Sequence, residues 1–276
     1  MQIKISLIQT SQDRKSELAR FIESLNRQVG INFGEIQLIF IDQEDNRSVF
    51  KHLNKNINFT YIKYKHCSLS HARNIGLKHV KGEYIGFPDD DCWYKQDTLE
   101  KIFNHINNGY SGVIAKSTDE TGVTTNKSPR KSQQISLYNH CGAISYTIFL
   151  KFVPDLLFDE KLGVGSPYQL SSGEETDYLI RFIKKKGANI YYDCNIIIHH
   201  PKGKHGNFSD VDSKQYEYAR GWGFLLRKHH FPIKIILKSF IRPICGILFY
   251  SLTLNKKGRL HSYHILKGRI EGYIYK

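Results

Sequence analysis

The sequence has few residues that form covalent cross-links. Only five of its 276 residues are cysteines, an odd number that includes no Cys-x-x-Cys pair. This excludes a dense disulfide framework and a zinc knuckle, and it favours a reducing compartment such as the cytosol. The first ten residues also lack an apolar run long enough for a signal peptide or a membrane-spanning helix, so we expect a mature N-terminus.

Acidic residues are scarce towards the C-terminus. Residues 201–276 hold 15 Lys and Arg against 4 Asp and Glu, a net charge of +11, whereas residues 1–200 carry only +3 of the total of +14. A basic segment of this kind can meet nucleic acid, an anionic bilayer or acidic substrates, and charge alone does not choose among them. With 40% hydrophobic residues, the chain can bury a substantial core. We therefore expect one mixed domain followed by a basic tail.

Strand-like and helix-like patterns alternate in the first half of the sequence. Strands are predicted at 3–10, 36–41, 59–64 and 84–87, and helices follow Thr10, lie near 46–54 and run from Ser70 to about Val80. This alternation favours an α/β fold with a mixed, mostly parallel sheet flanked by helices. A polar loop is predicted at 117–134, a strand and a helix between 135 and 152, and a helix from Glu174 to Gly187.

Three consecutive carboxylates, Asp89, Asp90 and Asp91, directly follow the predicted strand at 84–87. Ligands of open α/β sheets bind beyond the carboxyl ends of strands, and Thr10 and Asp42 end earlier strands at the same edge. Carboxylate oxygens suit Mg²⁺ or Mn²⁺ that also holds phosphate oxygens. A solvated acidic turn is the alternative, but like charges this close are unfavourable without a counter-ion. The cluster therefore indicates a metal site.

Glu174 and Glu175 open a predicted helix, where the helix dipole favours the ionised carboxylate. Either residue could serve as a general base. Acidic residues are also ordinary at helix N-termini, so this pair becomes informative only together with the other motifs.

Taken together, these motifs resemble the inverting family 2 glycosyltransferases of the GT-A fold. The matching segments stand in the family's order and are Ile3–Thr10, Leu38–Asp42, Ser70–Gly76, Gly82–Asp91, Phe158–Glu160 and Gly173–Asp177. The sequence departs from the family at Gln9-Thr10-Ser11, at Asp42-Gln43 and at Glu174-Glu175, where the family has Glu-Asp.

The resemblance implies roles for the residues at the donor side. Thr10 and Asp42 would contact the nucleobase and ribose, and Arg73 would lie near the uracil or the diphosphate. Asp90 would take the ribose side, and Asp89 would also belong to the donor-binding residues. These are the contacts of a nucleotide-sugar donor, most simply a UDP-sugar.

The resemblance also implies a divalent metal, Mn²⁺ or Mg²⁺, and a catalytic carboxylate. Asp91, with Asp89, would bind the metal. Some relatives add a histidine after the next strand, where this chain offers His199 and His200, and His199 is the first choice. Glu175, with Glu174 beside it, would deprotonate the acceptor, so that the anomeric configuration inverts.

The tail contains an amphipathic pattern. From Ile233 onwards, Lys234, Lys238 and Arg242 lie four residues apart, and aliphatic and aromatic residues fall mostly opposite them. This pattern is typical of a helix in the plane of an anionic membrane surface, and the three charges and Pro243 argue against a spanning helix. Packing of the apolar face against the catalytic domain is the alternative.

The sequence thus predicts a metal-dependent glycosyltransferase on the inner face of the cell membrane. Its acceptor would be a saccharide or a saccharide linked to a polyprenyl diphosphate, in the synthesis of a surface polysaccharide such as a capsule. The expected domains are a GT-A domain at 1–205, with a nucleotide-sugar half at 1–116 and an acceptor half at 135–205, and a helical membrane-associating region at 206–276.

Three other functions compete with this prediction. A nucleotidyl- or phosphotransferase would need a Gly-rich phosphate loop, and residues 10–15 contain no glycine. A nucleic-acid-binding protein would need a recognition motif, and none is found, so no nucleic-acid partner is expected. A catalytically inactive membrane scaffold is the third.

Overall fold

A computed structural model describes residues 2–12, 14–202 and 208–275. The chain forms two compact units, and each is described by itself. The first comprises Met1–Cys67, His71–Leu157 and Leu179–Lys202, and the second comprises Ser68–Ser70, Phe158–Tyr178 and Gly203–Lys276. The domain boundary predicted at 205/206 lies outside the described residues.

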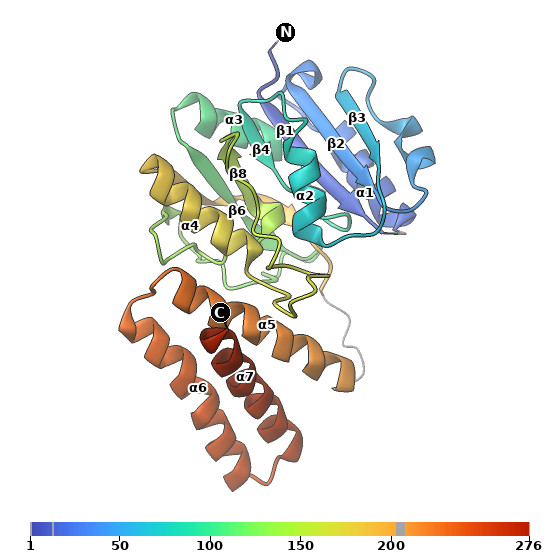
Figure 1. The fold of residues 1–276 in the computed structure, drawn as a ribbon. Coiled ribbons are helices and arrows are strands. Elements are labelled where there is room, and N and C mark those ends of the chain that lie inside the picture. The colour runs from blue at the N-terminus through green and yellow to red at the C-terminus, as the bar shows by residue number, and fades with distance from the viewer. Residues whose placement is uncertain (1, 13, 203–207, 276) are drawn as a thin grey trace. The chain divides into compact units, whose positions relative to one another are not determined.

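The first unit is built on a single mixed sheet (Figure 1). In spatial order its strands are β3 (Asn58–Lys63), β2 (Ile36–Asp42), β1 (Ile5–Ser11), β4 (Tyr84–Gly86), β8 (Ile148–Lys151), β6 (Gly112–Thr118), β9 (Ile190–His199) and β5 (Trp93–Tyr94), and β7 (Gln133–Gln134) pairs with β9.

The sheet is parallel only in part. Strands β3, β2, β1 and β4 form a continuous parallel half, and β6 is parallel to β9. The other pairings, β4 with β8, β6 with β8, β5 with β9 and β7 with β9, are antiparallel. The prediction of a mostly parallel sheet therefore holds for the half that ends in Thr10, Asp42 and the aspartates. It overstates parallel pairing in the other half.

Apolar alternation along the strands places helices on both faces of this sheet. One face, with Leu7, Leu38 and Phe40, packs in a single core with helices α1 (Lys15–Asn26) and α3 (Thr98–Asn107). On the opposite face, Gly76 of α2 (Leu69–Leu77) lies against Ile8 and Ile41 so closely that a Cβ atom there would clash. Both helix layers thus leave the carboxyl ends of β1, β2 and β4 at one edge.

Several predicted elements differ from the structure. The helix expected near 46–54 is a short 3₁₀ helix, Arg47–His52. The predicted polar loop at 117–134 begins with the last residues of β6 and ends in β7. Between 135 and 152 a strand was expected and is present as β8, but the expected helix is only a 3₁₀ turn, Ser145–Thr147. These segments are short, so tertiary contacts rather than local propensity decide their conformation.

The second unit contains three long helices, α5 (Phe208–Lys228), α6 (Ile233–Leu252) and α7 (Lys256–Ile274), and the start of α4 (Glu174–Lys186). Helix α7 packs against both α5 and α6. Gly272 and Gly268 let α7 approach the backbone of α5, where a Cβ atom at Gly272 would collide with the Arg220 carbonyl. Small residues four apart on a helix permit such close approach.

Pro243 lies inside α6 without ending it. A proline has no N–H, so the carbonyl of Ser239, four residues earlier, loses its helical partner. The Arg269 Nη1 of α7 donates a hydrogen bond to that Ser239 carbonyl. The Ser239 hydroxyl in turn accepts a hydrogen bond from Trp222 Nε1 of α5 at 3.1 Å. Ser239 therefore connects all three helices.

The outer face of α6 is apolar and exposed. We define this outer face as Ile233, Leu237, Ile241, Ile244, Leu248 and Leu252, which are 43% to 85% exposed. By length and composition α6 meets the criteria for a helix that crosses a membrane. Only 6% of its apolar 18-residue stretch is buried. The prediction of a surface-lying helix rested on Lys234, Lys238, Arg242 and Pro243, and it stays a prediction.

Candidate donor and metal site

Polar side chains gather at the carboxyl edge of the parallel half-sheet. Ser11 pairs with Asp42 in the register of β1 and β2, and β4 lies beside β1 and runs on to the aspartate cluster, Asp89–Asp91. The edge predicted from the sequence therefore exists in the first unit. It brings residues from three strands and their loops together.

Asp89 faces the interior of this edge. Its Oδ1 accepts hydrogen bonds from Arg73 Nη2 at 3.1 Å and from Ser145 Oγ at 3.2 Å. Arg73, from α2, is only 2% exposed, so its positive charge is fixed beside the carboxylate. Burial raises the pKa of Asp89, although the charge of Arg73 opposes this shift. Arg73 was predicted to lie near the donor. In the structure its charge lies against Asp89, on the side of the aspartate cluster that faces α2.

Asp90 and Asp91 share one arginine. Arg14 Nη1 lies 3.1 Å from Asp90 Oδ1 and 2.6 Å from Asp91 Oδ2. Ser11 Oγ donates a second hydrogen bond to Asp90 at 2.8 Å. Burial raises the pKa of Asp90 to about 6, against the effects of Ser11 and Arg14. Arg14 and Ser11 were not predicted as site residues, although Ser11 ends β1 and Arg14 lies in the loop that follows it.

His200 completes the cluster. Its Nε2 lies 2.9 Å from Asp91 Oδ1, and its ring stacks on Tyr146 at a centroid distance of 4.7 Å. Burial opposes protonation of His200, but its hydrogen bond to Asp91 and the charge of that carboxylate raise the pKa of the imidazole. The same contact and Arg14 lower the pKa of Asp91 despite its own burial.

His199, the first choice from the sequence, points elsewhere. Its Nδ1 lies 3.0 Å from the Asp119 carbonyl oxygen and 3.1 Å from Thr118 Oγ1, and its ring stacks on Trp93. Successive side chains of an extended chain point to opposite sides, so only one of the two histidines can face the aspartates. The geometry favours His200, the alternative that the sequence had left open.

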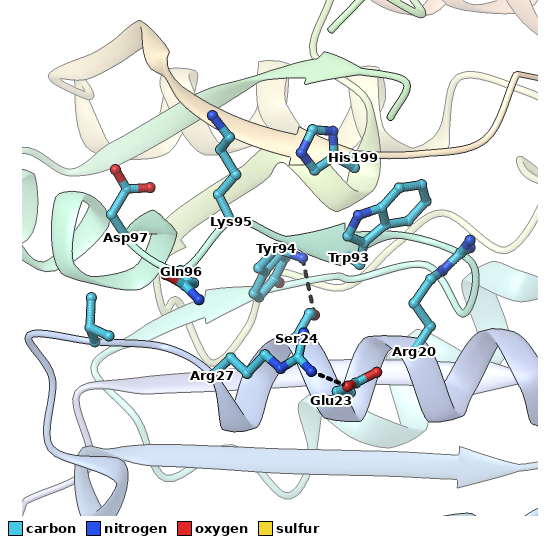
Figure 2. Close-up of a pocket in the computed structure, with 11 residues that line it drawn as sticks. Arg20, Glu23, Ser24, Arg27, Trp93, Tyr94, Lys95, Gln96, Asp97 and His199 are labelled. Carbon is cyan, nitrogen blue, oxygen red and sulfur yellow. Dashed lines mark hydrogen bonds and ion pairs between the residues drawn. The ribbon is translucent and has the colours of Figure 1, made fainter. Parts of the chain in front are cut away.

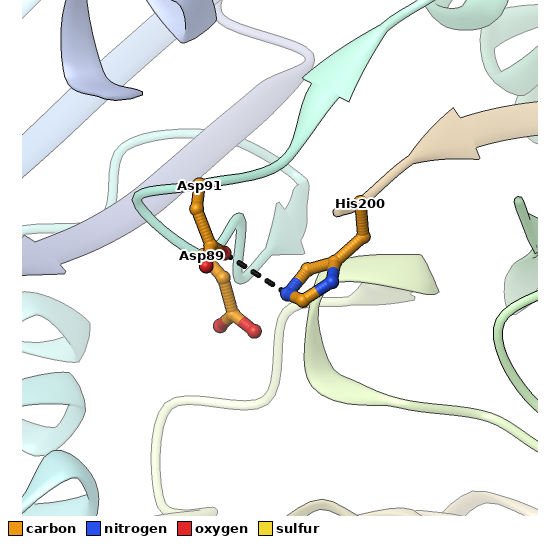
Figure 3. A group of neighbouring side chains, drawn as sticks. All are labelled: Asp89, Asp91 and His200. Atoms are coloured by element: carbon orange, nitrogen blue, oxygen red, sulfur yellow. Dashed lines mark ion pairs between the residues drawn. The ribbon is translucent and has the colours of Figure 1, made fainter. Parts of the chain in front are cut away.

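Asp89, Asp91 and His200 together could hold a divalent cation. One ligand atom from each lies within 4.8 Å of the others, as Figure 3 shows for their side chains. Two carboxylate oxygens and one imidazole nitrogen are a donor set that suits Mn²⁺ and leaves positions for phosphate oxygens. These residues therefore fit the metal that the sequence predicted.

Thr10 and Asp42 engage the protein itself. The Asp42 carboxylate, fully buried, accepts hydrogen bonds from Tyr61 Oη at 2.6 Å and from the backbone N–H groups of Asn46 and Glu44 at 2.8 and 3.0 Å. Thr10 Oγ1 donates to the Ile41 carbonyl and accepts from Gln43. Both residues shape the loop after β2, and their predicted contacts with a nucleotide stay predictions.

Glu174 and Glu175 lie in the second unit, where α4 begins after Gly173. Glu174 is 6% exposed, whereas Glu175 is half-buried and accessible. One turn later, the buried Asp177 binds Lys228 Nζ at 2.6 Å and His229 Nε2 at 2.8 Å. This ion-pair cluster was not predicted, and it fixes the start of α4 on the end of α5. The catalytic roles of Glu174 and Glu175 stay predictions.

A separate pocket of about 630 Å³ lies between α1 and β5 (Figure 2). It is lined by Trp93, His199 and cationic side chains that include Arg20 and Lys95. Arg20 lies 3.9 Å from the Trp93 ring centroid and donates a hydrogen bond to the Asp91 carbonyl at 2.8 Å. Arg20 thus supports the backbone of the aspartate cluster from the side of α1.

Comparison with known proteins places this geometry in a family. A glycosyltransferase of Haemophilus influenzae is 26% identical over 204 residues, which cover 68% of this chain and 64% of that protein. The poly(ribitol-phosphate) β-N-acetylglucosaminyltransferase TarP of Staphylococcus aureus is 29% identical over 116 residues, 40% of this chain and 35% of TarP. The chain thus spans less than two thirds of the length of these relatives.

Solved structures show the same fold at low sequence identity. S. aureus TarS 1–349 in complex with UDP-GlcNAc matches 99% of this chain and 93% of its own with a TM-score of 0.58 at 14% identity. The mannosyltransferase PcManGT of Pyrobaculum calidifontis, in complex with GDP-Man and Mn²⁺, matches all of this chain and 88% of its own with a TM-score of 0.65 at 10% identity.

These likenesses confirm the predicted GT-A fold. The family model described as glycosyl transferase family 2 matches residues 6–159, more than half of the chain and the whole aspartate cluster. The chain therefore belongs to glycosyl transferase family 2.

Proposed function

We propose that this protein transfers a sugar from a nucleotide-sugar donor, most simply a UDP-sugar, to a saccharide acceptor, with inversion of the anomeric configuration. The observation that carries this proposal is the group formed by Asp89, Asp91 and His200 at the carboxyl edge of the sheet. The family membership and the nucleotide sugars bound to TarS and PcManGT support it.

The metal would be held by Asp89, Asp91 and His200, as Mn²⁺ or Mg²⁺. When bound, it acts as a Lewis acid that neutralises charge on the departing diphosphate. His200 replaces His199 in this assignment because only His200 contacts Asp91. Arg73 keeps the Asp89 carboxylate in place through its 3.1 Å contact.

Glu175 is proposed as the general base. Its carboxylate takes the proton of the acceptor hydroxyl, whose oxygen forms a bond to the anomeric carbon while the bond from that carbon to the diphosphate oxygen breaks. The nucleoside diphosphate leaves with the bonding electron pair. Glu175 is favoured over Glu174 because it is the more accessible of the two.

The acceptor is proposed to be a surface polymer or its lipid-linked precursor. TarP is named for poly(ribitol-phosphate), and a 36% identical segment of 95 residues, 32% of this chain and 10% of the relative, belongs to a Bacillus subtilis protein of minor teichoic acid biosynthesis. Residues 206–276 are proposed as the membrane-associating region, at the cytoplasmic face of the cell membrane, and residues 1–205 as the GT-A domain.

Helices α6 and α7 support the membrane proposal through their charge. Residues 233–275 contain eight Lys and Arg but a single acid, Glu271. The exposed outer face of α6 lies beside Lys234, Lys238 and Arg242 on the same helix. An apolar face next to basic residues is typical of a helix at a membrane interface. Each Lys or Arg near an anionic surface contributes about 1 kcal/mol to binding.

The experiment is a screen of UDP-, GDP- and dTDP-sugars for Mn²⁺-dependent donor hydrolysis and transfer. In wild-type protein one donor class should be hydrolysed only when Mn²⁺ is present. Asp91→Asn should abolish the Mn²⁺ dependence, and Glu175→Gln should bind the donor normally yet lose at least about 100-fold in transfer, the usual scale of general-base catalysis. Normal transfer by Glu175→Gln would show that Glu175 is not the general base. Activity without a metal would show that Asp89, Asp91 and His200 do not act by binding one.

A further inference from the structure

Among the described residues, Arg14 is the most accessible of the cations that touch the aspartate cluster. Its side chain is 49% exposed, whereas Arg73 is 2% exposed. Arg20 reaches only the Asp91 carbonyl and lies against Trp93. Arg14 is therefore the arginine of this cluster that a soluble ligand can reach directly.

Arg14 uses only one of its three nitrogens in these contacts. Nη1 bridges Asp90 and Asp91. Within the part of the chain that the structure describes, Nε and Nη2 form no hydrogen bond, and both are donors of a planar guanidinium that suits phosphate oxygens. The side chain can thus keep its contact with Asp91 and bind an anion at the same time.

The contact between Arg14 and Asp91 indicates which anion Arg14 would bind. Asp91 presents Oδ1 to His200 at 2.9 Å and Oδ2 to Arg14 at 2.6 Å. A ligand bound at the Asp89, Asp91 and His200 group therefore adjoins the guanidinium. A divalent cation together with Arg14 and Arg73 brings four positive charges to at most three carboxylates, and the surplus suits the two negative charges of a nucleotide-sugar diphosphate.

We propose that Arg14 binds the diphosphate of the donor and stabilises the charge that gathers on the leaving nucleoside diphosphate. This inference rests on the proposed function. It assigns a donor-binding role to a residue of the loop between β1 and α1, beyond the aspartates, His200 and Arg73. Arginines at developing phosphate charge lower transition-state barriers in other phosphate-transferring sites.

The test uses the full chain and two binding measurements. Mn²⁺ binding without nucleotide is followed by the electron paramagnetic resonance signal of free Mn²⁺. Binding of UDP, and of inorganic pyrophosphate as a probe without a base, is followed by calorimetry at saturating Mn²⁺. The variants are Arg14→Gln and Arg14→Lys. Arg27→Gln, directly after α1, is the control, since Arg27 is 65% exposed and, among the described residues, forms an ion pair only with Glu23.

Arg14→Gln should weaken UDP and pyrophosphate binding by about 10- to 100-fold, the range for hydrogen bonds to charged groups. Its affinity for Mn²⁺ alone should be unchanged or higher, because a cation that competes for Asp91 is gone. Arg14→Lys should fall between wild type and Arg14→Gln, and Arg27→Gln should match wild type.

Two results would overturn the inference while leaving the proposed function intact. In one, Arg14→Gln binds UDP within twofold of wild type. In the other, Mn²⁺ affinity falls in parallel with UDP affinity, which would show that Arg14 only organises the aspartates. Failure of the wild-type protein to bind UDP, GDP or dTDP in the presence of Mn²⁺ would instead overturn the proposed function itself.

Discussion

At the scale of single residues, the site is defined by how each carboxylate is neutralised. Asp89 is neutralised by a buried arginine, Asp91 by His200 and an accessible arginine, and Asp42 by hydrogen bonds together with Lys63, whose Nζ lies 4.0 Å from the carboxylate. The first two arrangements leave room for an exchangeable cation and anion. The third does not, since Asp42 is fully buried and its hydrogen bonds come from the protein.

Asp42 provides a prediction about pH. Burial disfavours its ionisation, but the hydrogen bonds from Tyr61 and Asn46 outweigh this and lower the pKa of Asp42. A lowered folded-state pKa contributes stability that is present above the unfolded pKa and is lost as pH falls through the folded value. Tyr61→Phe should therefore reduce the free energy of unfolding by about 1.5 to 3 kcal/mol at neutral pH.

The difference between Tyr61→Phe and wild type should shrink between about pH 5 and pH 2, as Asp42 becomes protonated in both. Urea unfolding across this range measures it. Tyr168→Phe, at a 42% exposed tyrosine, is the control and should change stability little. A difference that stays constant over this range would show that the Tyr61 hydroxyl acts independently of the charge on Asp42.

The sequence predicted the residues of this site unevenly, for physical reasons. The aspartates were found because a short buried strand ends directly before them. The choice between His199 and His200 depended on alternation along β9, and a register shift of β6 against β9 at Ala115/Lys116 interrupts that alternation. Arg14 was missed because a long side chain from a loop can reach many partners, and the sequence does not say which.

At the scale of elements, helices α5 and α7 are held by close backbone contact. Alanine normally stabilises a helix by about 1 kcal/mol relative to glycine. At Gly272, however, a Cβ atom would meet the Arg220 carbonyl. Local propensity and packing therefore make opposite predictions for the same substitution.

We expect packing to decide, so that Gly272→Ala lowers the free energy of unfolding by about 1 to 3 kcal/mol, the usual range for overpacking. Thermal and urea unfolding of the full chain measure the change. Ile270→Ala, two residues away at a 45% exposed position, should stay within about 0.5 kcal/mol of wild type. A more stable Gly272→Ala protein would mean that α5 and α7 can separate at this point without loss.

Elements were predicted from the sequence where they are long and amphipathic. Helix α4 begins at Glu174 and ends before Gly187, which has a φ of +56°, as expected from its glycine stop. Helix α6 was predicted as amphipathic, but its apolar residues serve two faces. Phe240 packs on Tyr273 of α7 at a centroid distance of 5.8 Å, while Leu237 and Ile241 stay exposed. Periodicity alone does not divide one apolar stripe between a helix partner and an open surface.

At the scale of the whole molecule, charge and apolar surface coincide in one part of the chain. The formal charge of +14 comes mostly from residues 201–276, which also include the exposed outer face of α6. A second copy of the same surface would be repelled by its like charge, whereas an anionic bilayer would be attracted. This distribution is the reason to test lipid binding with the full chain.

The double variant Ile241→Asp/Leu248→Asp should bind vesicles of phosphatidylcholine and phosphatidylserine at least about 10-fold more weakly than wild type, because two apolar contacts are lost and anionic charge is added. Binding of wild type should also weaken as salt is raised. Vesicle co-sedimentation measures both effects. Val29→Asp, at a 51% exposed position in the first unit, controls for the added charge. Equal binding by wild type and the double variant would exclude the outer face as the lipid contact.

The proline within α6 has a consequence for work on fragments. The Ser239 carbonyl that Pro243 leaves without a helical partner is capped by Arg269, 30 positions after Ser239 in the chain. A peptide that contains α6 alone lacks this cap, and an isolated helix is free to bend at a proline. The continuous shape of α6 is thus a property of the three-helix assembly, and the conformation of an excised segment in detergent or lipid would not represent the intact protein.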